Sequence, residues 1–568
     1  ATLTPVSGMT LDKLTVSSTI SIPTGNSLTV STTLTVATGT TFTWGIGTLA
    51  VNGALNLNGT LDGSGNSGTL TYKGSSAFPT TGTSTPSKII FDTANYDQTV
   101  SNRDYSGITV QFDNSGSRAT GTITLGDGAG QTLRTGAISL APTVNNIVVD
   151  GSVYNPTVSS TAGISGSASL VKNLNLGSGT WKFSGSPAFT NINSLTAPAS
   201  STILFNGSSQ TLTGASKTFN NLDFSAATAA TISGNVTSTG NVTLGSGMTL
   251  TGVTLLMTST SATLVGAGNT LPNLTINPAS AGTTTLSTSD LTISGTLDVG
   301  SNGTLSIGSG RTLTESSAGT LTLNGTIAGS GDLIYQSTNT FPTGGNVSST
   351  LTYDATAGNL NVVNRTYGGL VKINNSGGTA GRVVTLGTTS GQTLNFSNSL
   401  TLLASGASVT STAATYSPVI DITGDLDGSA AGTKTFVTGT STLTVSGNVN
   451  FTNTTLSATS SHTLVMSGSS KTLTSNSNTL QNLTISGNSN TLADNLAVAG
   501  DLDLSGSGLS AGVTTITMTS SSATLIGGGN TVNNLTASST GTITATSSDL
   551  IVGGTFTIAT STSLSINS

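Results

Sequence analysis

The chain has 568 residues, of which 72 are glycine, only 6% are charged and 4% are aromatic, and its net charge is −6. Its basic residues are few and scattered, so it has no electrostatic reason to bind nucleic acid or an anionic membrane. The sequence contains no run of about 18 apolar residues, so no membrane span is predicted. The absence of cysteine excludes disulfides, thiolate metal ligands and cysteine nucleophiles.

Short strands are predicted from the first residues onward. Apolar–polar–apolar triplets start six to eight residues apart, at 14–16, 20–22, 28–30, 34–36, 42–44, 49–51 and 55–57. Alternation with a period of two places two side chains of a triplet on one face of a strand and the middle one on the other. Gly, Asn, Ser and Thr fill the short links between triplets, and these residues favour tight corners.

Strands this short and this closely spaced predict an all-β fold, a parallel β-solenoid (β-helix) with about 20 residues per coil. Leu, Val and Ile would fill a narrow interior and lie above their equivalents in the next coil, while Thr would face water. The spacing of an amphipathic helix is missing from the sequence. Stability is therefore expected to come from the stacking of coils and not from charge.

Aromatic, proline and charged residues concentrate at about 72–118 and again at 335–380. The candidate residues of the first stretch are Tyr72, Phe78, Asp92, Arg103 and Tyr105. Those of the second stretch are Tyr335, Phe341, Asp354, Arg365 and Tyr367. Two interpretations stay open. One is a structural bracket, in which an Asp–Arg pair and tyrosine hydroxyls tie a bulging loop to the coils; the other is a lateral contact or glycan-binding patch that exposes Tyr and Arg.

These two stretches belong to a long tandem repeat of about 261 residues, an architecture that is usually quasi-one-dimensional. The segment 8–16 recurs at 268–276 and again at 529–537, at offsets of 260 and 261 residues. We expect the end of a preceding repeat at 1–7, a first copy at 8–267, a second at 268–528 and the start of a third at 529–568. Because both ends interrupt the repeat, we also expect an excerpt of a longer array.

The sequence predicts that the chain is not an enzyme. His462 is the single histidine, and the matching position of the first copy lacks one, so we interpret it as an exposed residue beside a strand. The carboxylates do not converge as glycoside hydrolysis requires. Asp421, Asp425 and Asp427 form the densest acidic group, which allows a weak surface calcium site, although solvated corner residues are the simpler interpretation. No other cofactor is expected.

The phrases at 482–487 (Asn-Leu-Thr-Ile-Ser-Gly), 443–448 (Leu-Thr-Val-Ser-Gly-Asn) and 322–326 (Thr-Leu-Asn-Gly-Thr) carry a resemblance to a known group. The chain resembles the Thr/Ser/Gly/Asn-rich β-helical repeats of large bacterial surface proteins, which include autotransporter passengers, filamentous-haemagglutinin-like adhesins and giant repeat proteins. The resemblance implies an extracellular or cell-surface rod that serves adhesion, coating or fibre formation. No secretion domain or adhesive tip is recognisable.

Three functions are therefore hypotheses. The first is a structural rod or filament subunit of a cell-surface fibre, coat or matrix, which self-associates end to end or laterally through open strand edges. The second is an adhesin stalk that binds glycans or the surfaces of host or neighbouring cells. The third is an ice-binding solenoid, which the variable spacing of the triplets disfavours.

Overall fold

The computed structural model describes residues 1–63, 65, 67–214, 216–457, 461–546 and 548–566. Its regular elements are β-strands, which pair in parallel. The chain divides into two compact units, Ala1–Thr284 (unit 1) and Thr285–Ser568 (unit 2). Within the described part of the chain, no helix has the length and apolar character needed to cross a bilayer.

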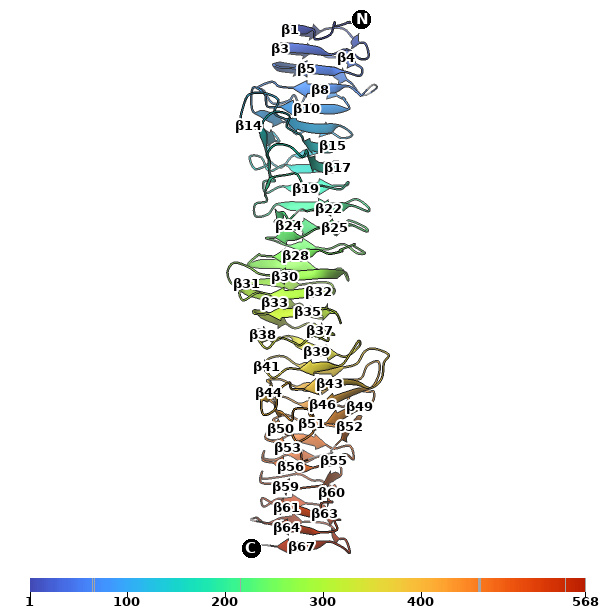
Figure 1. Ribbon diagram of the computed structural model, residues 1–568, viewed down its shortest axis with the longest axis vertical. Coiled ribbons are helices and arrows are strands. Elements are labelled where there is room, and N and C mark those ends of the chain that lie inside the picture. Colours follow the sequence, from blue (N-terminus) through green and yellow to red (C-terminus); the bar gives the residue numbers. More distant parts are fainter. Residues whose placement is uncertain (64, 66, 215, 458–460, 547, 567–568) are drawn as a thin grey trace. The chain divides into compact units, whose positions relative to one another are not determined.

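Unit 1 is a parallel β-solenoid whose strands form successive rungs, blue to green in Figure 1. One wall contains β1 (Thr10–Val16), β3 (Leu28–Val36), β5 (Thr48–Val51), β8 (Thr69–Tyr72), β10 (Lys88–Asp92), β13 (Thr109–Asp113), β15 (Thr132–Leu140), β17 (Thr157–Gly166), β19 (Thr180–Phe183) and β21 (Thr202–Phe205). A second begins with β2 (Ile20–Ile22), β4 (Thr41–Trp44), β7 (Thr60–Asp62) and β9 (Thr83–Ser84). A five-stranded sheet follows in the middle of the unit, made of β11 (Gln98–Val100), β14 (Thr120–Leu125), β16 (Asn146–Asp150), β18 (Lys172–Asn175) and β20 (Ser194–Thr196).

Unit 2 repeats this plan from yellow-green to red in Figure 1. One wall contains β32 (Leu291–Val299), β34 (Thr312–Glu315), β37 (Asp332–Tyr335), β39 (Thr350–Asp354), β42 (Val371–Asn374) and β45 (Leu400–Leu402). Another contains β41 (Thr366–Tyr367), β44 (Thr393–Phe396), β47 (Val419–Ile422), β50 (Thr442–Val445), β53 (Thr463–Met466) and β56 (Asn482–Ile485). The five-stranded sheet of this unit is β40 (Leu360–Val362), β43 (Arg382–Leu386), β46 (Val409–Thr412), β49 (Lys434–Val437) and β52 (Thr454–Ser457).

The number of residues per coil varies along the chain. Paired residues of neighbouring coils are 19 positions apart for Thr463 and Asn482 but 29 apart for Val371 and Leu400, and the mean is about 21 residues per coil. The longer coils are those that carry the five-stranded sheets. The prediction of an all-β parallel solenoid with about 20 residues per coil is confirmed, as is the tandem repeat.

The interior of each unit is a column of apolar side chains. Along β3 the inward Leu28, Val30, Leu34 and Val36 are at most 1% exposed, and the residues between them are not buried. The register places each inward residue above an equivalent one, for example Leu49 above Leu70. Because burying one Leu or Val side chain contributes about 1.5–3 kcal/mol, stacking stabilises every coil that has a neighbour on both sides.

Glycines permit close contact between coils at one corner of unit 2. A Cβ atom added to Gly447, Gly468, Gly487 or Gly506 would collide with a backbone carbonyl oxygen of the preceding coil. These four glycines are 21, 19 and 19 residues apart, so they occupy one position in successive coils. A residue with any side chain would force the coils apart there, which explains the glycine spacing in physical terms.

Candidate functional site

The candidate residues of unit 1 form a buried aromatic cluster, which we call bracket 1. Tyr72 ends β8, Phe91 lies in β10, and Tyr105 ends β12 (Asp104–Tyr105). Phe78, from the loop after β8, inserts among them, with ring centroids 5.4 Å from Tyr72, 5.6 Å from Phe91 and 6.1 Å from Tyr105. All four side chains are at most 1% exposed, so the cluster attaches the loop to the interior of the coils.

Unit 2 contains the matching cluster, bracket 2. Phe341 lies 5.0 Å from Tyr335, 5.6 Å from Tyr353 and 6.4 Å from Tyr367, measured between ring centroids. Tyr353 replaces the Phe91 of bracket 1, and its hydroxyl lies 2.8 Å from that of Tyr367. These rings too are at most 1% exposed. Neither bracket therefore presents its aromatic rings as a surface platform.

Each bracket is closed by an arginine. Arg103 donates from Nη1 to the carbonyl oxygen of Pro79 at 2.6 Å and from Nη2 to that of Gly82 at 3.2 Å. Its guanidinium carbon lies 5.5 Å from the ring centroid of Phe78 and 5.8 Å from that of Tyr105. A cation over an aromatic face gains electrostatic stabilisation, and the planar fork of arginine suits several carbonyl acceptors.

Arg365 makes the same contacts in bracket 2. It lies over the Phe341 ring at 5.7 Å and donates to three carbonyl oxygens of the loop, those of Pro342 at 2.7 Å, Gly344 at 3.0 Å and Gly345 at 2.8 Å. Both arginines thus hold a backbone loop against the coil with donors that are already engaged.

The expected Asp–Arg pair is replaced by a different arrangement. Asp92 accepts a 2.9 Å ion pair from Lys73 and hydrogen bonds from the backbone N–H and the hydroxyl of Ser115, at 3.0 and 2.5 Å. Asp354 accepts from Gln336 at 3.0 Å and from Ser376. The aspartates and the arginines do not pair because they lie at different places. Each aspartate ends a strand and contacts the neighbouring coils there, whereas each arginine reaches the loop that follows β8 in unit 1 or β37 in unit 2.

Two tyrosine hydroxyls of the brackets form hydrogen bonds with the loops. Tyr72 donates to the carbonyl oxygen of Ser76 at 2.9 Å, and Tyr335 donates to that of Asn339 at 2.6 Å. Burial raises the pKa of each of these two phenols to about 12. They therefore stay protonated at neutral pH, act as hydrogen-bond donors, and are not poised to serve as general bases.

Two buried lysines were not predicted from the sequence. Lys172 begins β18 and Lys434 begins β49, and each side chain is 1% exposed. The ammonium of Lys172 donates to the carbonyl oxygens of Ser169 and Leu170, both at 2.6 Å. The ammonium of Lys434 contacts its own preceding loop in the same way. The sequence could have indicated these lysines, because they are 262 residues apart and therefore occupy the same position in both copies of the repeat.

His462 is more buried than the sequence predicted. His462 is 1% exposed, so its interpretation as an exposed residue was wrong; its Nε2 accepts from the backbone N–H of Gln481 at 3.4 Å.

The aspartates of the acidic group form hydrogen bonds with the backbone. Asp425 accepts from the backbone of Asn448 at 2.7 Å, and Asp427 from that of Ser429 at 2.9 Å. Among the residues that the structure describes, no three His, Cys, Asp or Glu side chains are grouped to hold a metal.

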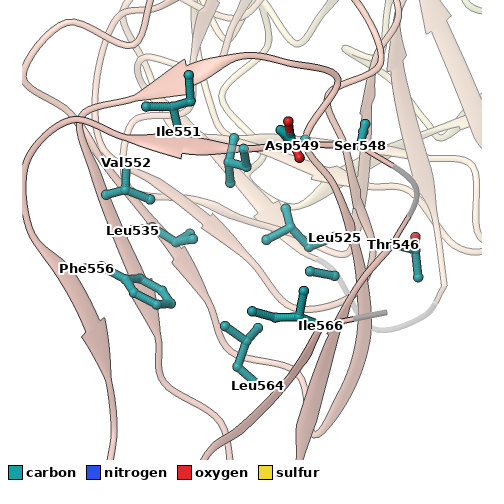
Figure 2. A pocket seen from close by; sticks show the side chains of 13 residues that line it. Leu525, Leu535, Thr546, Ser548, Asp549, Ile551, Val552, Phe556, Leu564 and Ile566 are labelled. Atoms are coloured by element: carbon teal, nitrogen blue, oxygen red, sulfur yellow. The ribbon is translucent and has the colours of Figure 1, made fainter. Parts of the chain in front are cut away.

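A hollow with a volume of about 1000 Å³ lies at the last described coils of unit 2. Figure 2 shows Leu525, Leu535, Phe556, Leu564 and Ile566 directed into it. Several of these residues occupy positions that the next coil covers elsewhere in the unit. The hollow thus lies in the apolar interior of the last described coils, where Phe556 is 44% and Ile566 is 76% exposed.

Comparison with known proteins identifies no relative: no family model, curated protein or solved structure matches this chain. The fold alone defines the class of protein. It is a Thr/Asn-rich parallel β-solenoid, as β-helical repeat proteins are.

Proposed function

We propose that this chain is an extracellular structural element, a rod or filament subunit of a cell-surface fibre, coat or matrix, without catalytic activity. The observation that carries the proposal is the use of the chemically capable side chains for bracing. Asp92, Arg103, Arg365, Lys172 and Lys434 all hold the chain's own loops or backbone. A protein whose polar groups secure its own coils is suited to bearing load and providing length.

Self-association end to end is the form of assembly that we propose. At the last described coils, as at every coil, the parallel strands and the apolar surface inside them are the faces on which a further coil stacks, since open edges and apolar surface both favour pairing with another chain. Phe556 and Leu564 line that surface. A second copy that places its first coil there would bury them.

Negative-stain electron microscopy of the purified chain at micromolar concentration tests this proposal. We expect linear filaments from the wild type and short separate particles from a Phe556→Asp, Leu564→Asp double variant. Val513→Asp is the matched control, because Val513 is 88% exposed and lies outside the hollow. Separate particles from the wild type would contradict end-to-end assembly.

The two alternatives receive less support. The aromatic rings of both brackets are buried, so a glycan at either bracket would meet only the loops and the arginine edges, and the adhesin hypothesis draws no support from the bracket rings. An ice-binding face would need a regular array of hydroxyls. One column of outward residues along β44, β47, β50, β53 and β56 instead reads Asn395, Asp421, Thr444, Val465 and Thr484.

A further inference from the structure

Glu315 is a carboxylic acid in the apolar interior of unit 2. It ends β34, and its register partners are Ile293 of β32 and Tyr335 of β37. Its side chain is 0% exposed, and neither carboxylate oxygen has a hydrogen-bond partner. An ionised carboxylate in such a place would lose the solvation of its charge with no partner to replace it.

The turn at 316–319 encloses this carboxyl group. Oε1 lies so close to Gly319 that a Cβ atom added there would collide with it. The carbonyl oxygen of Gly319 accepts from the Ser337 hydroxyl at 2.5 Å and from the Asn339 amide at 2.7 Å. These two hydrogen bonds to the next coil hold the turn closed over the carboxyl.

The first copy shows what the position requires for packing. There β5 pairs with β8 as β34 pairs with β37, and Val51 lies opposite Tyr72 as Glu315 lies opposite Tyr335. Val51 is 0% exposed. An apolar side chain therefore fills this column in unit 1, and packing alone does not explain the glutamic acid.

The neighbouring titratable groups offer Glu315 no compensating charge. Tyr335 and Tyr353 share its wall, and their hydroxyls bond to Asn339 and Tyr367. Other ionisable groups on the adjoining strands lie half-buried at alternate, outward positions or bond elsewhere: Asp298 of β32, Asp332 of β37, which pairs with Lys372, and Asp354 of β39, which accepts from Ser376. Arg311, just before β34, donates to Thr288.

We propose that Glu315 makes this coil proton-sensitive: the protonated carboxyl keeps β34 and the turn at 316–319 closed, and loss of the proton favours an opened coil in which the carboxylate reaches water. The inference goes beyond the structural role proposed above and does not depend on it.

The direction of the pH effect follows from linkage. Burial raises the pKa of Glu315 from 4.5 to about 8 in the closed coil. In an opened, solvated coil the group ionises near its ordinary value. Between these two values the opened coil binds fewer protons, so the opening equilibrium rises about tenfold per pH unit. The coil is therefore most firmly closed in acid and loosens toward pH 8, beyond which the effect levels off.

Native-state hydrogen exchange of the full chain tests this, with Glu315→Val as the comparison because valine fills the equivalent position of unit 1. Protection factors for amides 312–323 would be measured at pH 5, 6, 7 and 8. We expect the ratio of variant to wild-type protection to rise about tenfold per pH unit, or about a hundredfold or more in all. A ratio that stays constant across this range would overturn the proposal.

Two further variants separate ionisation from packing. Glu315→Gln keeps the shape but cannot ionise, so its protection factors are expected to be independent of pH; a slope that persists in it would assign the effect to another group and contradict the proposal. Val51→Glu is expected to install the same slope at amides 48–51 of unit 1. A flat response there would show that this interior column does not confer the effect.

Discussion

At residue scale, the two brackets differ in the residue that binds the aspartate at the end of the strand. Lys73 of bracket 1 forms an ion pair with Asp92, whereas the equivalent Gln336 of bracket 2 donates a neutral amide hydrogen bond to Asp354. Burial by itself would raise the pKa of Asp92, but hydrogen bonds from Ser115 and the Lys73 ammonium outweigh burial and lower the pKa below its ordinary value. The ionised form of Asp92 is therefore the one that stabilises unit 1.

This difference predicts acid-dependent stability at Asp92. A carboxyl with a lowered pKa contributes stability above its unfolded value, and that contribution is lost as pH falls through the folded value. We expect Asp92→Asn to reduce the free energy of unfolding by about 1–3 kcal/mol at pH 7, and by clearly less at pH 3.

Urea unfolding of wild type and variant at the two pH values measures this. Lys73→Gln, which copies bracket 2, is expected to remove part of the pH dependence while keeping a hydrogen-bond donor. An Asp92→Asn deficit that is equal at pH 3 and pH 7 would show that the ionised carboxylate is not the source of the stability.

At the scale of the element, the strands are too short to be stable alone, and they depend on the neighbouring coil. β54 (Thr472–Thr474) has three residues and β57 (Thr491–Leu492) has two, while isolated hairpins of greater length are only marginally stable in water. The corner glycines matter for the same reason, because they let coils approach closely enough for such short ladders to form.

A substitution in the glycine column therefore has a defined consequence. In Gly468→Ala the new Cβ would collide with the carbonyl oxygen of Ser446, and we expect a loss of about 1–3 kcal/mol from overpacking. The measurement is the midpoint of thermal or urea unfolding. Gly378→Ala is the matched control, since nothing lies within 4 Å of its Cβ position, and an equal loss in both variants would refute the close-contact explanation.

At the scale of the whole molecule, each unit is stabilised by apolar stacking and backbone ladders with little help from charge. Three ion pairs occur among the described residues, Lys73–Asp92, Arg118–Asp97 and Lys372–Asp332. Of their side chains only Asp92 is fully buried, and surface pairs contribute about 0–1 kcal/mol each.

The stability of the protein is consequently expected to be nearly independent of salt. Raising sodium chloride from 0.05 to about 1 M shortens the Debye length to about 3 Å and should change the free energy of unfolding by less than about 1 kcal/mol. Denaturation curves in urea, which adds no ionic strength of its own, provide the measurement. A loss of several kcal/mol in high salt would reveal an electrostatic contribution that the ion pairs do not account for.

The sequence by itself determined the solenoid, because its signal is local. Alternation between residues i and i+2 defines which side chains point inward, and the glycine- and asparagine-rich links define the corners, so triplets such as 28–30 and 49–51 predict both strands and coil length. The repeat offset then predicts that bracket 1 and bracket 2 share one design.

Only the tertiary structure decided the partners of the polar residues. Lys73 and Asp92 are 19 positions apart, and Lys73 and Ser115 are 42 apart, so their contact depends on the summed lengths of the intervening coils and the path of each corner. The same holds for the burial of His462 and Glu315. Strand alternation is fixed by neighbours along the chain, whereas a contact across coils is fixed by how the coils stack.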